Sequence, residues 1–171
     1  TTSHARARSR DTLAQSMQGA AKSVAIEKES LESQSLIVLQ QVNALTKSIA
    51  LLNNRIQQVS PSTNPGVLED QRQQDLLDLS QLIGIHTIST GGNGITVTTS
   101  GGAMLVADNT VTPLTGSLIN GATHYLSGGT DITTQLASGG GKLGGMLAAR
   151  DIDIPALQKS LDVLAYGIST T

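Results

Sequence analysis

Apolar residues recur in steps of four and three along the first third of the chain, and this repeat limits the possible folds most strongly. They are Val38, Val42, Leu45, Ile49, Leu52, Ile56 and Val59. Such steps place side chains on one stripe of an α-helix, with the period of a coiled coil. The same phase extends back through Leu31, Val24, Ala21, Met17 and Ala14, and only Ser35 and Lys28 interrupt it. We therefore predict one helix from about Asp11 to Ser60, ended by the Ser60-Pro61-Ser62 turn.

The polar side of this predicted helix carries amides in place of charges. Between Ser33 and Leu68 the only charged residues are Lys47 and Arg55. The other polar positions hold Gln34, Gln40, Gln41, Asn43, Asn53, Asn54, Gln57 and Gln58. An amide can hydrogen-bond to a neighbour without the desolvation cost of a charge. We expect this face to contact other segments or neighbouring subunits, with a solvated face as the alternative.

The middle of the chain predicts a second helix followed by short strands. The helix runs from about Val67 to Ile83 with Gly84 as its stop, and the short preceding loop favours an antiparallel helical hairpin. Glycine-rich turns at 91–94 and 101–102 separate three β-prone runs, which are Ile85–Thr90, Ile95–Thr99 and Ala103–Val106. This pattern predicts an antiparallel meander in which Ile95, Val97 and Thr99 face the core. Further strands are expected near Thr123–Leu126 and Thr130–Leu136.

A second helical stripe near the C-terminus suggests how the chain closes on itself. Its residues are Ile154, Leu157, Leu161, Leu164 and Ile168, with Asp153 and Pro155 at the helix start. We expect it to pack against the stripe from Val38 to Val59. The predicted fold class is α+β, a long antiparallel helical bundle or coiled coil with an inserted small antiparallel β meander. Its expected parts are 1–83 for the long helix and hairpin, 84–138 for the β-rich excursion, and 139–171 for the glycine turn and returning helix.

Composition excludes several classes of function. The chain has no cysteine, so disulfides, thiolate nucleophiles and Cys-ligated metal sites are ruled out. A formal net charge of −2 with 14% charged residues provides no basic field, and we expect no nucleic-acid partner. No apolar stretch approaches the roughly 18 residues of a membrane span, and we expect no membrane partner.

The residues that could carry chemistry are not arranged for it. His4, His86 and His124 have no second histidine or carboxylate three or four positions later, so we expect no metal site. We interpret the acidic residues of the second predicted helix as a solvated face. On it we expect Arg72 to pair locally with Asp70 and Asp75. We therefore predict no catalytic, cofactor-binding or metal-binding residue, no cofactor and no enzymatic activity.

A glycine-rich segment, Ser138 to Gly145, superficially resembles a phosphate-binding loop. Leu143 stands where such a loop needs a hydroxyl residue after Lys142. We interpret Gly141, Gly144 and Gly145 instead as a segment where the backbone turns sharply into a helix and packs closely on the β meander or the second helix, with no room for a Cβ at one or more of these positions.

Three stretches in order resemble a known family. They are QVNALTKSIALLNNRI at 41–56, LEDQRQQDLLDLS at 68–80, and GKLGGMLAARD at 141–151, which continues through Ile154-Pro155 to Leu161-Asp162 and Leu164-Ala165. Their order and spacing are similar to the flagellar hook-associated protein 1 family, also called FlgK, over about Asp11 to Ile168. Relative to that family the chain lacks both ends, so we expect a fragment that folds without being able to assemble.

The resemblance implies a structural protein of the bacterial flagellum, a self-assembling junction between hook and filament. It implies an extracellular location, reached by export through the flagellar secretion apparatus. The implied partners are neighbouring copies of the same protein, the hook protein, the second junction protein and a flagellar export chaperone. The alternative is a phage tail fibre or trimeric adhesin-like segment of coiled coil and β modules, which predicts an obligate trimer where the flagellar fragment should be a monomer.

Overall fold

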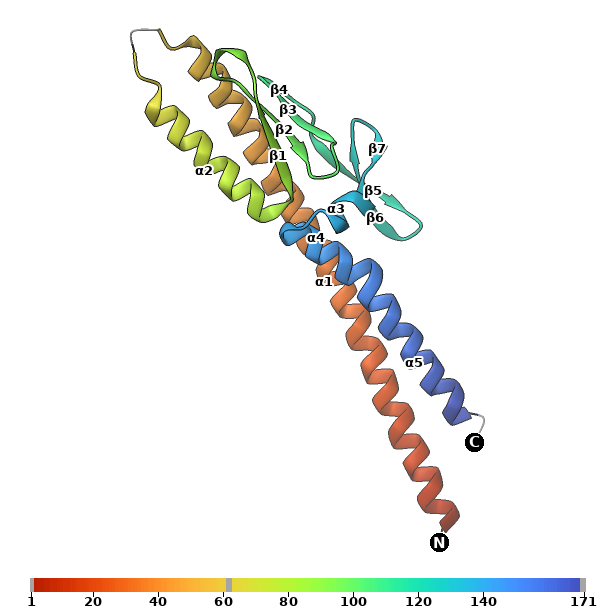
Figure 1. Ribbon diagram of the computed structural model, residues 1–171. Coiled ribbons are helices and arrows are strands. Elements are labelled where there is room, and N and C mark those ends of the chain that lie inside the picture. Colours follow the sequence, from red (N-terminus) through yellow and green to blue (C-terminus); the bar gives the residue numbers. More distant parts are fainter. Residues whose placement is uncertain (1, 61–62, 170–171) are drawn as a thin grey trace. The chain divides into compact units, whose positions relative to one another are not determined.

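The structure is a computed structural model that describes residues 2–60 and 63–169. In the order of the chain, helices come first and last, and the strands of two small sheets come between them (Figure 1). The contacts divide the chain into two compact units, one of residues 34–148 and one of residues 1–33 with 149–171. Helix α1, Thr2–Gln58, contributes to both units. The three parts predicted from the sequence follow changes of secondary structure rather than packing, and that organisation stays a prediction.

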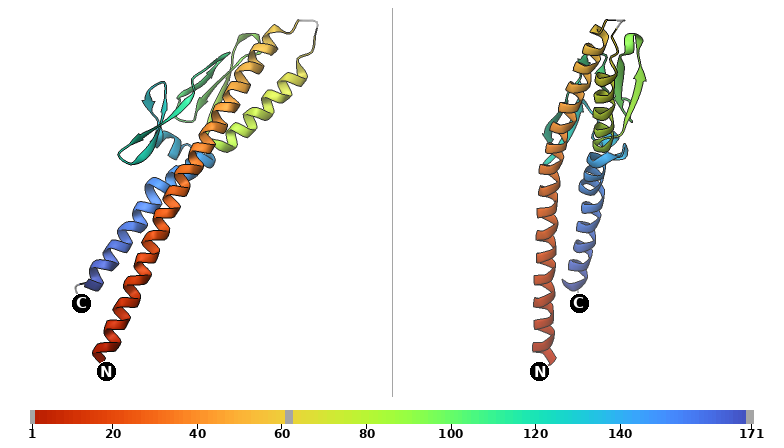
Figure 2. Two further views of the ribbon diagram at one scale, coloured as in Figure 1. Left: turned by 180° about the vertical axis from the view of Figure 1, so that it is seen from behind. Right: turned by 90° about the vertical axis from the view of Figure 1, so that its left-hand side faces the viewer.

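Two antiparallel helices form one side of the unit of residues 34–148. The C-terminal part of α1 lies beside α2, Gly66–Leu82, in all three views (Figures 1 and 2). Both predicted helices are confirmed, and α1 begins earlier than the predicted start. The predicted turn at Ser60-Pro61-Ser62 falls partly on residues 61 and 62, which lie outside the described residues.

The β region forms two antiparallel sheets rather than one meander. The first sheet has the order β1-β2-β3-β4, with bounds Ile85–Ser89, Ile95–Thr99, Met104–Ala107 and Thr110–Val111. A 3-10 turn at Gly91–Asn93 joins β1 to β2. The second sheet has the order β5-β6-β7, with bounds Leu114–Ile119, Ala122–Ser127 and Thr130–Asp131. The predicted α+β class and its first three strands are confirmed.

The predicted strand at Thr130–Leu136 is wrong beyond Asp131, because helix α3, Thr133–Ser138, begins there. The carboxylate of Asp131 accepts a hydrogen bond from the Thr133 backbone N–H at 2.9 Å and another from its hydroxyl at 2.6 Å. This side-chain turn starts a helix in a segment whose β-branched residues favour a strand.

The predicted stripe on α1 is buried in the core of this unit. Val38, Val42, Ile49, Leu52 and Ile56 are each at most 4% exposed, and Leu45 and Val59 are half-buried. The core joins this stripe to α2, both sheets, α3 and the next helix, α4, Gly141–Ala148. Of the residues that face it, the largest fully buried ones are Leu79, Ile83, Leu105, Leu114, Tyr125, Leu143 and Leu147.

The expected partner of that stripe is wrong. Leu157 and Leu164 are 50% and 58% exposed, and neither belongs to the core that buries Val38 to Ile49. The physical reason is that α2 and the sheets, which lie within the same compact unit, already cover the stripe.

Gly84 follows α2 but does not stop it through a left-handed conformation. Its φ is not positive, and Ile83 already has extended backbone as the helix cap. A Cβ at Gly84 would collide with the backbone carbonyl oxygen of Gly139. Glycine is therefore required at position 84 by the close approach of the chain that enters α4.

The unit of residues 1–33 and 149–171 is a pair of helices. A π-helical stretch, Ala149–Asp153, leads into α5, Ile154–Ser169, which runs beside the N-terminal part of α1 (Figure 2). The predicted C-terminal helix is confirmed. Ile154 is buried, Leu161 and Ile168 are half-buried, and the remaining two members of its predicted stripe are largely exposed.

Candidate functional site

The histidines lie apart on different elements. His4 is exposed on α1, His86 is exposed on β1, and His124 is half-buried on β6. Within residues 2–60 and 63–169, no group of three or more His, Cys, Asp or Glu side chains could hold a metal ion. That the chain has no site residues stays a prediction.

One histidine does join an acidic residue. His124 Nδ1 lies 2.6 Å from Asp131 Oδ2, on the strands β6 and β7. The hydroxyl and backbone N–H of Thr133 and then His124 lower the pKa of Asp131 to about 2, because each hydrogen bond favours the charged carboxylate. Since the Thr133 hydroxyl also accepts from the Tyr125 backbone N–H at 2.8 Å, this cluster ties β6 to the start of α3.

The buried cation of this unit was missed by sequence reasoning, and the predicted pairing of Arg72 with Asp70 and Asp75 is wrong. Arg72 is 7% exposed and donates to Asn53 Oδ1 at 2.8 Å and to the Asn93 carbonyl at 2.6 Å. Burial lowers its pKa, which the nearby charge of Glu69 opposes. Asp75 accepts instead from the Ser48 hydroxyl at 2.5 Å.

Two asparagines of α1 attach the strands to the helix. Asn43 donates to the Leu114 carbonyl at 2.8 Å and accepts from the Leu114 N–H at 2.9 Å. Asn53 donates to the carbonyls of Ile95 and Asp108 at 2.8 and 2.5 Å. For these positions the expectation of contact with other segments is confirmed. The amides replace the hydrogen bonds that a neighbouring strand would make.

The glycine-rich entry to α4 is a packing site. A Cβ on Gly144 would lie 2.8 Å from the Leu136 carbonyl, and one on Gly141 would lie 2.7 Å from the Ile83 backbone. The predicted lack of room for a Cβ is confirmed at these two positions. Gly141 packs on the end of α2, as predicted, whereas Gly144 packs on α3, which was not the predicted partner. At Gly145, by contrast, nothing lies within 4 Å of the place of a Cβ.

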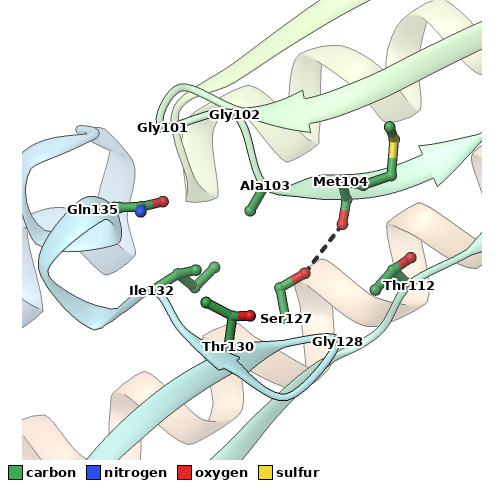
Figure 3. A pocket seen from close by; sticks show the side chains of 10 residues that line it. All are labelled: Gly101, Gly102, Ala103, Met104, Thr112, Ser127, Gly128, Thr130, Ile132 and Gln135. Carbon is green, nitrogen blue, oxygen red and sulfur yellow. Dashed lines mark hydrogen bonds between the residues drawn. The ribbon is translucent and has the colours of Figure 1, made fainter.

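A cleft of about 380 Å³ opens between the two sheets. Figure 3 shows it between the Gly101-Gly102 turn, Thr112 and the Gly128 turn, with the Ser127 hydroxyl donating to the Met104 carbonyl at 3.2 Å. Its lining contains no charged side chain or histidine. The polar side chains of this lining are three hydroxyls and one amide, beside apolar residues and glycines, and they provide no general acid, base or nucleophile pair.

A second buried arginine holds the helix pair of the other unit. Arg150, 2% exposed, contacts Glu32 of α1 at 3.1 Å and binds both oxygens of Asp151 at 2.6 and 2.8 Å. It lies in the π-helical stretch, a geometry that widens one turn of a helix. This arginine orders the entry to α5.

The helix pair leaves much apolar surface uncovered. Its large exposed residues are Leu13, Ile26, Ile152, Leu157, Val163, Leu164 and Tyr166. A groove of about 320 Å³ between the two helices is lined by Ala14, Met17, Gln18, Ala165 and Ile168. Exposed apolar side chains concentrated on one helix pair are typical of an interaction site. By length and composition His4–Gln58 could also cross a membrane, contrary to the sequence expectation. The same test is passed by soluble core helices, and α1 carries the buried core stripe.

Comparison with known proteins gives consistent results. The family model described as "Flagellar hook-associated protein FlgK helical domain" matches residues 4–171. Flagellar hook-associated protein 1 of Escherichia coli (strain K12) is 28% identical over 144 residues, covering 75% of this chain and 25% of that protein. The flagellar hook junction protein FlgK from Burkholderia pseudomallei has a similar structure, with a TM-score of 0.70, 30% identity, and coverage of 82% of this chain and 27% of that one.

The chain therefore spans about a quarter of the length of these relatives. The comparisons favour the flagellar resemblance over the phage tail fibre or trimeric adhesin alternative. Because the family model covers nearly the whole chain, the chain belongs to the family of the FlgK helical domain.

Proposed function

We propose that this chain is the helical part of a flagellar axial protein that joins hook and filament, and that its role is structural rather than enzymatic. The observation that carries the proposal is the set of exposed apolar residues on α5. Leu157, Val163, Leu164 and Tyr166 are each at least half exposed, although α1 lies beside the same helix. A pair of helices with exposed apolar side chains of this kind is stabilised by an assembly that covers those side chains.

The proposed partners follow from the family. They are neighbouring copies of the same protein, the hook protein and the second junction protein, with a flagellar export chaperone before assembly. The proposed location is extracellular, on the flagellum, after export by the flagellar secretion apparatus. The lack of cysteine is compatible with a chain that folds outside the cell without disulfides.

The test replaces one exposed apolar residue of α5 in the full-length protein of the source bacterium. Leu164→Glu should leave export intact and abolish filament attachment and swimming, because a charge cannot be buried in the covered face. Gln158→Glu is the matched control, since it places the same charge at an exposed polar position of the same helix. Equal swimming of the two strains, with filaments seen by electron microscopy in both, would refute the proposed role of α5.

A further inference from the structure

Two strands expose an unpaired edge. β1 ends the first sheet and β5 ends the second, whereas the other edge strands, β4 and β7, have two residues each. Two hydrogen bonds at the ends of β1 show which of its residues bond to β2. The Ser100 N–H donates to the Gly84 carbonyl, and the Thr90 N–H donates to the Gly94 carbonyl. Backbone groups alternate in an antiparallel ladder, so those of Ile85, Thr87 and Ser89 point outward.

The outward groups of β5 follow from the same alternation. Leu114 directs its N–H and carbonyl away from β6, since the amide of Asn43 binds both. Gly116 and Leu118 therefore also face outward, and within the described residues their outward N–H and carbonyl groups have no hydrogen-bond partner. Asn43 thus occupies one end of this edge and leaves the other open.

Neither edge carries the usual protection against pairing. β1 and β5 contain no Asp, Glu, Lys, Arg or Pro. Ile88 is 58% and Leu118 is 76% exposed. Natural proteins normally blunt an open edge with a charge, a proline or a bulge, because an unprotected edge is a template for another strand. These two edges are built to receive one.

We propose that β5 of one copy pairs with β1 of a neighbouring copy, which continues one sheet into the next across the contact. The proposal rests on the proposed function, because it needs copies of the chain to assemble. Pairing of two different edges is head-to-tail and can propagate around or along an axis, whereas pairing of β5 with β5 would close at a dimer. β1 has three residues whose backbone groups point outward, and β5 has two free ones, Gly116 and Leu118. Both free residues of β5 can therefore pair with residues of β1.

The contact is tested by covalent trapping, because the chain has no cysteine of its own. Chains with Ser117→Cys on β5 are mixed at high concentration with differently tagged chains that carry Ile88→Cys on β1. A short bis-maleimide reagent should join the two kinds about tenfold faster than it joins Ser117→Cys to a Gln73→Cys control on exposed α2. A rate equal to the control, or a predominant product between two Ser117→Cys chains, would overturn the proposal.

A charge at the edge provides the second measurement. Leu118→Lys in the Ser117→Cys chain should reduce the mixed product at least about fivefold, because a lysine on an edge strand opposes pairing. Val67→Lys is the matched control, since Val67 is 82% exposed at the start of α2. Circular dichroism checks that both variants fold. We expect both to fold because the two positions are exposed. Equal yields from the two variants would overturn the edge contact and leave the α5 test of the proposed function unaffected. A swimming Leu164→Glu strain would refute the proposed role of α5 independently.

Discussion

Single polar side chains decide how the strands attach to α1. Asn43 satisfies both backbone groups of Leu114, and Asn53 joins two carbonyls of the first sheet to the guanidinium of Arg72. Buried polar groups of this kind stabilise only when every member is paired. Their loss therefore costs more than the loss of one surface hydrogen bond.

Arg72→Met tests this network. The change should lower the free energy of unfolding by about 2–3 kcal/mol, because Asn53 and the Asn93 carbonyl lose charged hydrogen bonds in a buried site. Arg55→Met, at an exposed position of α1, should change it by less than about 0.5 kcal/mol. Urea unfolding measures both. Equal midpoints would show that the guanidinium contributes nothing beyond its alkyl chain.

Two neighbouring glycines give a sharper comparison. Gly144→Val should destabilise the chain by about 1–3 kcal/mol, since the new side chain would have to displace the Leu136 carbonyl. Gly145→Val, one residue along the same helix, meets nothing within 4 Å and should be close to neutral. Thermal melts of the two variants decide it. A midpoint for Gly144→Val at or above that of the parent would refute close packing at this position.

At the scale of elements, the stripe on α1 contributes the helical half of the core. Its period places the same face of α1 against α2 and the sheets over several turns. Ile49 is completely buried, whereas Leu45 is only partly covered, in a shallow groove beside Leu82. The stripe is therefore not uniform in what each residue contributes.

Ile49→Ala should lower the free energy of unfolding by about 2–4 kcal/mol through lost burial and the cavity left behind. Leu45→Ala should cost less than Ile49→Ala, because the site is already partly open to water. Leu51→Ala, at a position 51% exposed on the same helix, is the control and should have a small effect. Denaturant titration would contradict the packing if Ile49→Ala and Leu51→Ala gave the same midpoint.

The start of α3 should respond to acid. The pKa of Asp131 is lowered to about 2 in the folded chain, against about 3.9 when unfolded, so its stabilising effect is complete above about pH 4. That contribution is lost as the pH falls through 2. Asp131→Asn should therefore melt below the parent at pH 7, and the gap should narrow between pH 4 and 2. Asp70→Asn on α2 is the control; a gap independent of pH would contradict the assignment.

At the scale of the whole molecule, the core of residues 34–148 closes within one copy of the chain. The chain does not need two identical seams to bury its main apolar stripe, unlike an obligate trimer. We therefore expect a monomer of 17.6 kDa by light scattering in dilute solution. Edge pairing between copies is weak alone and is detected by trapping. A stable trimer at low concentration would contradict the expected monomer.

Periodicity and glycine placement predicted the local structure well because both act within a few residues. Steps of three and four define helix faces, and alternating β-prone runs between glycines define β1, β2 and β3. β5 was missed, although Asn120-Gly121, with φ of 50° and 80°, forms a two-residue turn that typically joins strands. That dipeptide was the signal available in the sequence.

The sequence by itself determined α1, α2 and α5, the first strands, the α+β class and the family resemblance. Only the tertiary structure decided which surfaces meet. The stripe from Val38 to Val59 could have met any apolar face, and it packs on α2 and the sheets. Arg72 could have paired with Asp70 or Asp75, but it bonds to Asn53 and Asn93. These choices depend on distances between segments far apart in the chain, which no local pattern contains.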